Sequence, residues 1–182
     1  MAERWEILSK TLLVDRLPWL RLWEEQVRLP TGQVIPDWLR LEMPRYVVFF
    51  AVTVERTVPL IRCYKHGAAC MMVTLPGGYI DPGEEPLAAA QRELLEETGL
   101  ASDHWTQLAD YVVDANREAG RGCLFLAREA RQVTEPDDGD LEQIELFFHP
   151  LDQVRAVWRS AEMLQFSSSA CIALALDELG LF

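Results

Sequence analysis

A glycine-rich loop followed by one helix is the feature that most constrains the fold of this chain, and it runs from Gly78 to Leu100. Pro86 suits the first helical position, because an amide hydrogen is not needed there. Gly99 suits the position after the last helical residue, where the backbone often turns left-handed. An apolar stripe at helical spacing is formed by Leu87, Ala90 and Leu94. The pattern predicts a helix over residues 86–98.

The end of this helix carries an unusual amount of negative charge. Glu93, Glu96 and Glu97 lie three and four positions apart, so they share one side of the helix and repel one another. The carboxyl end of a helix also disfavours anions, because the helix dipole is negative there. A solvated acidic face is one interpretation, and a site that binds a cation is the other. The preceding glycine loop and the spacing together favour the cation site.

The same stretch matches a known motif at every defined position. The motif is G-x5-E-x7-R-E-U-x-E-E-x-G-U, where U is an aliphatic residue. Its fixed residues in this chain are Gly78, Glu84, Arg92, Glu93, Glu96, Glu97 and Gly99. On these residues the chain closely resembles the Nudix hydrolases. Members of that superfamily hydrolyse a diphosphate that is linked to another moiety, usually a nucleoside.

The resemblance implies which residues bind the metal. Glu93, Glu96 and Glu97 fall at the metal-ligand positions of the family, and the carbonyl oxygen of Gly77 is a further expected ligand. The cofactor is expected to be Mg²⁺ or Mn²⁺, which take oxygen ligands. Such an ion neutralises the diphosphate and lowers the pKa of a bound water. Glu96 and Glu97 are therefore also candidate catalytic residues.

The other motif residues are expected to support these ligands. Arg92 falls where the family uses an arginine to hold a glutamate carboxylate. It is therefore counted with the candidate catalytic residues, and its expected role is to hold a glutamate in place. Gly78 lets the backbone approach the metal. Glu84 lies just before the helix, where a carboxylate is favourable, and has a supporting role. Gly99 completes the structural motif by ending the helix.

Beyond the motif, the chain resembles the ADP-ribose and nucleoside-diphosphate-sugar pyrophosphatases. The segment LIRCYKHG, residues 60–67, is similar to the arginine-tyrosine-basic segment that those enzymes carry before their active-site loop. This likeness makes Arg62 and Lys65 candidate substrate-binding residues. The segment TLPGGYIDPGE, residues 74–84, is similar to their proline-glycine loop.

One region departs from this branch of the superfamily. Its members usually carry a serine-proline-glycine segment after the motif, and residues 112–122 contain no proline here. Arg117 and Arg121 in this region are candidates to bind phosphate or sugar through the planar guanidinium group. The alternative is that both are solvated loop charges.

The general base is expected outside the motif, because enzymes of this branch often place it on a late loop. The candidate loop is EPDDGDLEQIEL, residues 135–146, in which Glu142 matches best by its place before a strand and Asp140 comes next. A flexible acidic surface loop is the alternative. Glu142 is thus a candidate catalytic residue.

The order of predicted elements indicates an α+β fold. Strands are expected over residues 46–55, 58–65, 71–76, 106–114, 122–127 and 143–149, and helices over 86–98, 150–158 and 167–179. The segment YVVFFAVTV is apolar throughout, as expected of a strand that is buried on both faces. Serines stand where the N-cap of the last helix belongs. The resemblance implies the α/β/α sandwich of the Nudix fold, with a mixed sheet between helices.

The first 44 residues are expected to form a separate antiparallel β segment. Two extended stretches, 19–30 and 31–42, are joined by a turn at Pro30, Thr31 and Gly32. In the pyrophosphatases that the chain resembles, such a segment builds the dimer and part of the substrate pocket. We therefore expect an N-terminal β segment over residues 1–44, a Nudix domain over 45–182, and a homodimer.

Composition bears on the binding partners of the protein and on its location in the cell. The net charge is −12, which argues against general affinity for nucleic acid or an anionic membrane. The four cysteines show no metal-like spacing, so buried reduced thiols are expected. The chain shows no signal peptide, and its longest apolar run is too short to span a bilayer as a helix. A cytoplasmic location is expected.

Together these features predict a metal-dependent enzyme. The expected reaction is hydrolysis of the diphosphate bond in a small nucleoside diphosphate derivative, with ADP-ribose or a nucleotide sugar as substrate. The alternative is a catalytically silent nucleotide-sensing or interaction domain on the same fold. The intact motif favours the hydrolase.

Overall fold

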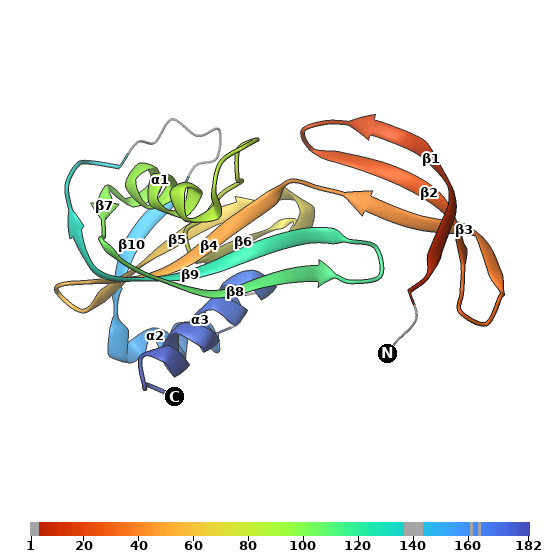
Figure 1. Ribbon diagram of the computed structural model, residues 1–182. Helices are drawn as coiled ribbons and strands as arrows, with labels where there is room; N and C mark the ends of the chain where they lie inside the picture. The colour runs from red at the N-terminus through yellow and green to blue at the C-terminus, as the bar shows by residue number, and fades with distance from the viewer. Residues whose placement is uncertain (1–3, 137–143, 161, 164) are drawn as a thin grey trace. The chain divides into compact units, whose positions relative to one another are not determined.

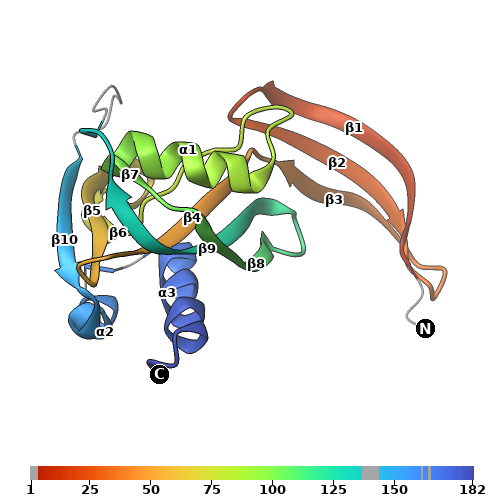
Figure 2. The ribbon, with the colours of Figure 1, turned by 60° about the vertical axis from the view of Figure 1, so that its left-hand side comes forward.

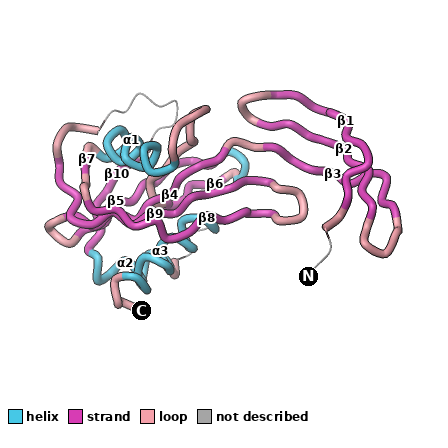
Figure 3. The backbone as a smooth tube through the Cα atoms, viewed as in Figure 1, coloured by secondary structure: helices cyan, strands magenta, loops and turns pink. Residues whose placement is uncertain are grey.

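The computed structural model describes residues 4–136, 144–160, 162–163 and 165–182, and it divides the chain into two compact units (Figure 1). The first unit comprises Met1–Arg45 with Tyr111–Arg121, and the second comprises Tyr46–Asp110 with Gly122–Phe182. The described helices all belong to the second unit, whereas the first is built from strands and turns (Figure 3).

Strand β4 (Arg45–Thr53) lies at the centre of the second unit and is buried on both faces. Its side chains alternate between two hydrophobic cores, as the period of a strand requires. Val47, Phe49 and Ala51 pack with the helix α1 (Pro86–Thr98), whereas Val48, Phe50 and Val52 pack with the helix α3 (Phe166–Glu178). The prediction that this apolar stretch is buried on both faces is confirmed.

The second unit contains two sheets. One has the order β4-β9-β7, with β9 spanning Ala119–Gln132 and β7 spanning Leu100–Ala101, and β8 (His104–Asp114) also pairs with β9. The other has the order β10-β5-β6, formed by Glu145–Pro150, Thr57–Lys65 and Cys70–Thr74. Strands β4 and β9 run in the same direction, whereas β5 pairs antiparallel with both of its neighbours (Figure 1). The expected α+β fold with a mixed sheet is confirmed.

Helices cover the two faces of these strands. Helix α1 lies on one side, and α2 (Val154–Trp158) and α3 lie on the other in both views (Figure 2). Short 3-10 turns at His66–Ala68 and Leu151–Gln153 complete the described helical segments. None of the described helices is long and apolar enough to cross a membrane. Three of the four cysteines are buried, as expected for thiols that pack as small apolar groups.

The first unit contains a three-stranded antiparallel sheet in the order β1-β2-β3, formed by Glu6–Arg16, Leu20–Arg28 and Val34–Glu42. The turn between β2 and β3 lies where the sequence predicts it, and the amide of Gly32 donates to the carbonyl of Leu29 at 2.9 Å. The sequence predicts only the hairpin of β2 and β3, whereas the structure has a third strand, β1, before it. The tip of the β8–β9 hairpin packs here, because the indole of Trp38 donates to the carbonyl of Asn116 at 3.1 Å.

Candidate active site

Helix α1 begins and ends where the sequence predicts. Pro86 occupies its first turn, and Gly99 is its left-handed C-cap, with a φ of 68° and an amide that donates to Leu95 at 2.9 Å. A Cβ atom at Gly99 would lie 2.1 Å from the carbonyl oxygen of Thr134. Glycine is therefore required here by the backbone angle and by the close approach of the chain after β9.

The buried face of α1 differs slightly from the predicted stripe. Ala90 and Leu94 are buried as expected, together with Ala89 and Thr98, but Leu87 is exposed. The helix therefore meets β4 through two adjacent alanines, which allow a close approach, rather than through Leu87. Leu94 fixes the rotation of the helix, so the neighbouring Glu93 faces away from the core.

The guanidinium of Arg92 gathers three carboxylates of the motif. Its Nε and Nη2 donate to the two oxygens of Glu84 at 3.0 and 3.1 Å. Its Nη1 donates to Glu93 at 2.8 Å and to Glu96 at 3.0 Å. These bonds raise the pKa of Arg92 and lower the pKa of the Glu84 carboxyl, for which the bond from Arg92 is the largest cause.

The loop before α1 is tied to the same arginine. Nη2 of Arg92 also donates to the carbonyl oxygen of Tyr79 at 3.0 Å, and the amide of Asp81 donates to Glu84 at 3.0 Å. These backbone contacts at Tyr79 and Asp81 escape sequence reasoning, since any residue type could supply them. Glu84 thus links the loop to the helix through one side chain that receives three hydrogen bonds.

Gly77 and Gly78 bring the loop into contact with both β4 and α1. The amide of Gly77 donates to Oε2 of Glu97 at 2.8 Å, and the carbonyl of Gly78 accepts from the amide of Val47 at 2.9 Å. A Cβ atom at Gly77 would lie 2.2 Å from the backbone carbonyl oxygen of Val47, so this position has no room for a side chain. A Cβ atom at Gly78 would lie 2.2 Å from Oε1 of Glu93 and would displace that carboxylate.

The beginning of this loop is held from the opposite side of the sheet by α3. The hydroxyl of the fully buried Ser168 accepts a hydrogen bond from the amide of Leu75 at 3.1 Å. The same hydroxyl donates to the side-chain oxygen of Gln165 at 3.0 Å. The predicted N-cap role of the serines is wrong, because Gln165 is the N-cap residue and α3 begins at Phe166. Ser168 lies inside the first turn and supports the loop instead, a role that a run of three serines does not reveal.

The oxygen atoms gathered here fit a divalent cation by their chemistry. Glu93, Glu96 and Glu97 offer carboxylates on one side of α1, and Gly77 adds a backbone carbonyl beside Glu97. Hard cations such as Mg²⁺ prefer these oxygens. Within the described residues, no three acidic, histidine or cysteine side chains already converge on one point. Instead, Arg92 holds the carboxylates of Glu93 and Glu96, and the amide of Gly77 holds that of Glu97.

The two cations predicted on β5 lie in different surroundings. Arg62 donates to Glu145 on β10 and to Glu162, each at 3.2 Å, and its guanidinium lies 5.4 Å from the ring centre of Phe147. These bonds, with Glu162 the largest cause, raise the pKa of Arg62. Lys65 is the last residue of β5 and lies opposite Cys70 of β6.

The remaining candidates fall elsewhere in the chain. Arg117 and Arg121 belong to the unit that contains β1, β2 and β3. Arg117 is exposed and forms an ion pair with Asp114 of its own hairpin at 3.4 Å. Glu142 lies outside the described residues, as does its alternative, Asp140.

Comparison with known proteins is consistent with this geometry. The family model of the NUDIX domain matches residues 43–166. The ADP-ribose pyrophosphatase of Mycobacterium tuberculosis (strain ATCC 25618 / H37Rv) is 30% identical over 132 residues, which cover 72% of this chain and 62% of that protein. The ADP-ribose pyrophosphatase of Bacillus subtilis (strain 168) is 28% identical over 122 residues, which cover 67% of this chain and 65% of that protein. The chain thus spans less than two thirds of the length of these relatives.

A solved structure supports the fold. The crystal structure of an ADP compounds hydrolase superimposes with a TM-score of 0.84 and 20% sequence identity, over 100% of this chain and 99% of that one. The family match covers most of the chain and includes every residue of the loop and helix that carry the carboxylates. The chain therefore belongs to the Nudix family.

Proposed function

We propose that this protein is a pyrophosphohydrolase that uses a divalent cation to hydrolyse the diphosphate bond of a small nucleoside diphosphate derivative. The observation that carries the proposal is the set of four motif glutamates positioned by Arg92 and by the Gly77 amide. Three of these carboxylates, those of Glu84, Glu93 and Glu96, share the guanidinium of Arg92. A polyanionic substrate needs an intervening cation to approach these carboxylates.

The cation proposed is Mg²⁺ or Mn²⁺, bound by Glu93, Glu96, Glu97 and the carbonyl of Gly77. When bound, it neutralises charge on the diphosphate and lowers the pKa of a coordinated water. Arg92 keeps Glu93 and Glu96 on the loop side of the helix through its two bonds from Nη1. The Gly77 amide fixes Oε2 of Glu97.

The base that accepts the proton of the attacking water is proposed to be Glu142, which precedes β10 in the sequence. General bases contribute by taking a proton as the water oxygen bonds to phosphorus. Glu142→Gln is expected to lower kcat at least tenfold while divalent-cation binding persists. A near-normal kcat in this variant, with activity lost in Glu97→Gln, would assign the base elsewhere.

ADP-ribose or a nucleotide sugar is the proposed substrate class. The support comes from two relatives that are named ADP-ribose pyrophosphatases and match this chain over two thirds of its length or more. Arg62, Lys65, Arg117 and Arg121 are the proposed substrate-binding cations. Arg62 already donates hydrogen bonds to two carboxylates, Glu145 and Glu162, which compete with phosphate for its guanidinium.

A homodimer formed through the N-terminal sheet is also proposed. The strand β1 and the turn after it expose large apolar side chains, among them Ile7, Leu12, Leu13, Leu17 and Trp19. Exposed apolar patches of this kind often mark interfaces between proteins. Light scattering coupled to gel filtration is expected to give twice the chain mass, and Leu13→Glu is expected to shift it to the monomer. If the wild-type protein is a monomer at micromolar concentration, the proposed homodimer is contradicted.

The protein is further proposed to act in the cytoplasm on small molecules rather than on nucleic acid. The support is the net charge of −12 and the burial of three of the four cysteine thiols, which fits a reducing compartment. Gel-shift titration with duplex DNA at physiological salt is expected to show no complex.

The proposed activity is tested by phosphate-coupled hydrolysis of a substrate panel with Mg²⁺ or Mn²⁺. The panel contains ADP-ribose, ADP-glucose, GDP-mannose, UDP-glucose, NADH, a diadenosine polyphosphate and an oxidised dGTP. Glu97→Gln is the inactive variant, and Glu85→Gln is the matched control from the exposed position before α1. Cation-dependent turnover that Glu97→Gln loses and Glu85→Gln keeps is expected. Binding of nucleotides without any turnover would instead indicate a silent sensing domain.

A further inference from the structure

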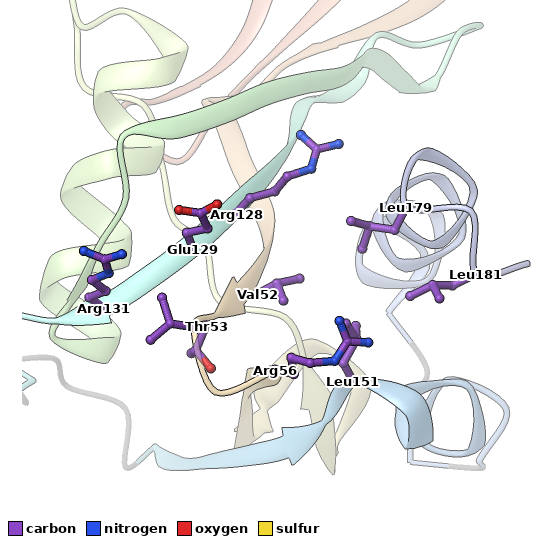
Figure 4. A pocket seen from close by; sticks show the side chains of 10 residues that line it. Val52, Thr53, Arg56, Arg128, Glu129, Arg131, Leu151, Leu179 and Leu181 are labelled. Atoms are coloured by element: carbon purple, nitrogen blue, oxygen red, sulfur yellow. The ribbon is translucent and has the colours of Figure 1, made fainter.

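A pocket of about 500 Å³ opens where β4 ends, and the known family site does not account for it (Figure 4). Its walls come from the end of β4, the turn into β5, the strand β9 and the residues that follow α3. Its lining, drawn from the described residues, includes no residue of the Nudix motif. The volume lies in the range of pockets that bind small molecules.

The charge of this pocket is opposite to that of the protein as a whole. Three arginines line it, Arg56, Arg128 and Arg131, together with one carboxylate, Glu129. The chain has a net charge of −12, so a group of cations is not the expected composition of its surface. A local excess of positive charge raises the concentration of anions at that place.

Two of the three arginines are available to a ligand. Arg128 is held, because it donates to Thr106 at 2.8 Å and to Glu178 at 3.0 Å. Arg56 and Arg131 are exposed, and neither has a carboxylate partner among the residues that the structure describes. The carboxylate of Glu129 lies 3.7 Å from Nε2 of His104.

The backbone at the rim of the pocket adopts conformations that most side chains avoid. Arg56 has a φ of 61° and Glu129 has a φ of 54°, both in the left-handed region. The amide of Arg56 donates to Thr53 at 2.9 Å and its carbonyl accepts from Leu151 at 3.0 Å, so the turn is fixed at both ends. Asparagine or glycine would fit such a position with less strain than arginine does.

The rest of the lining is aliphatic. In Figure 4, Arg56 lies beside Leu151, Arg128 extends from the opposite side, and Val52, Leu179 and Leu181 line the space between them. At the last turn of α3, the amides of Gly180 and Leu181 donate to the carbonyls of Asp177 and Leu176 at 2.9 and 2.8 Å. Among the described residues that line the pocket, none has an aromatic ring that could stack a nucleobase.

We propose that this pocket binds a phosphate monoester that carries a short aliphatic body. Arg56 contacts the phosphate, and Arg131 adds positive potential that favours a dianion over a singly charged carboxylate. Val52, Leu151 and the two leucines that follow α3 contact the body. The lack of a stacking ring separates this ligand from the nucleoside derivatives proposed for the motif site.

The test is isothermal titration calorimetry of the full chain with hexyl phosphate, in EDTA so that no divalent cation links the ligand to the motif. Saturable binding at one site is expected. Arg56→Gln is expected to weaken it at least tenfold and Arg131→Gln at least threefold. Arg159→Gln removes the same charge from an exposed position outside the pocket and is expected to change it less than twofold.

Further ligands test the two halves of the pocket. Leu181→Ala is expected to weaken hexyl phosphate at least threefold and to leave inorganic phosphate unchanged. Hexanoate is expected to bind at least threefold more weakly than hexyl phosphate. Vesicles of phosphatidylcholine with phosphatidic acid distinguish a lipid headgroup from a free ester, since cosedimentation that depends on Arg56 would assign the same chemistry to a membrane source.

The proposal is overturned if hexyl phosphate does not bind, if Arg56→Gln and Arg159→Gln behave alike, or if hexanoate binds more tightly. The measurement is independent of the proposed hydrolysis. Glu97→Gln is expected to bind hexyl phosphate as the wild type does, so an inactive enzyme and an empty pocket would be told apart.

Discussion

Two charged networks in this molecule are built in opposite ways. In the second unit, one guanidinium, Arg92, is shared by Glu84, Glu93 and Glu96. In the N-terminal sheet, one carboxylate, Glu25, is shared by Arg40 at 2.9 Å and Lys10 at 4.0 Å. The first network places one arginine among three carboxylates, and the second places two cations around one carboxylate. We call them the Arg92 network and the Glu25 network.

The two networks also differ in burial, because the Glu25 network is centred on a buried carboxylate and the Arg92 network is partly exposed. Glu25 is 3% exposed, and its partners are secured further, since Lys10 lies 3.6 Å from the ring centre of Trp23 and Arg40 also pairs with Glu118. In the Arg92 network, Glu96 stays exposed and Arg92 is about a third exposed. A closed, buried network contributes to folding, whereas an open one can accept a further cation.

The largest effect is expected from exchanging the arginines for lysines. Arg92→Lys keeps the charge but loses the fork that contacts three carboxylates and a carbonyl, so kcat/KM is expected to fall about a hundredfold. Arg40→Lys is the matched change in the Glu25 network and is expected to alter kcat/KM less than threefold. Steady-state kinetics with the best substrate of the panel measure both. Equal losses would mean that the two networks do not differ in role.

Removing one carboxylate from each network should change folding stability in opposite directions. Glu25→Gln leaves two cations without their shared partner, and because both are about a third exposed the expected loss is about 2 kcal/mol. Glu96→Gln relieves repulsion on α1 and is expected to stabilise the protein slightly, by about 0.3 kcal/mol. Urea unfolding in EDTA gives both values. A destabilised Glu96→Gln would show that its bond to Arg92 outweighs the repulsion.

Adding a divalent cation should stabilise only the protein whose Arg92 network is intact. At a Mg²⁺ concentration tenfold above the dissociation constant, linkage predicts about 1.4 kcal/mol of added stability. The shift is expected to persist in Glu25→Gln and to be largely lost in Glu93→Gln. Thermal unfolding with MgCl₂ or EDTA, at matched ionic strength, makes the measurement. An equal shift in Glu93→Gln would place the bound ion elsewhere.

The smallest effect is expected in the pH dependence of stability. Arg92 holds the pKa of Glu84 below its unfolded value, so this carboxyl stabilises the fold above its unfolded pKa. That contribution is lost as the pH falls through the folded pKa. Glu84→Gln is therefore expected to flatten the acid side of the stability curve, and Glu85→Gln to leave it unchanged. Parallel acid limbs for wild type and Glu84→Gln would contradict the assignment.

The loop and helix of the site could be predicted because their signals are local. Pro86 and Gly99 determine the ends of α1 through their own backbone preferences, and the spacing of the glutamates fixes their common side. The two-faced burial of β4 follows from an unbroken apolar run. These elements need no knowledge of distant contacts.

The features that escaped prediction depend on partners far along the chain. Strand β1 is defined by its pairing with β2, and its exposed, irregular pattern carries little signal of its own. Leu87 lies outside the core because α1 packs through Ala89 and Ala90. Arg62 meets Glu145 and Glu162 only after the sheet forms.

The hydrogen bond from Leu75 to Ser168 has a consequence for the order of assembly. A growing chain presents the loop and all the motif glutamates well before residue 168 is made, and domains fold as units once their parts are present. Nascent chains that end before α3 therefore contain the carboxylates without the support that holds the start of the loop. The motif glutamates are translated early, but the start of the loop gains its hydrogen bond to Ser168 only after synthesis has reached α3.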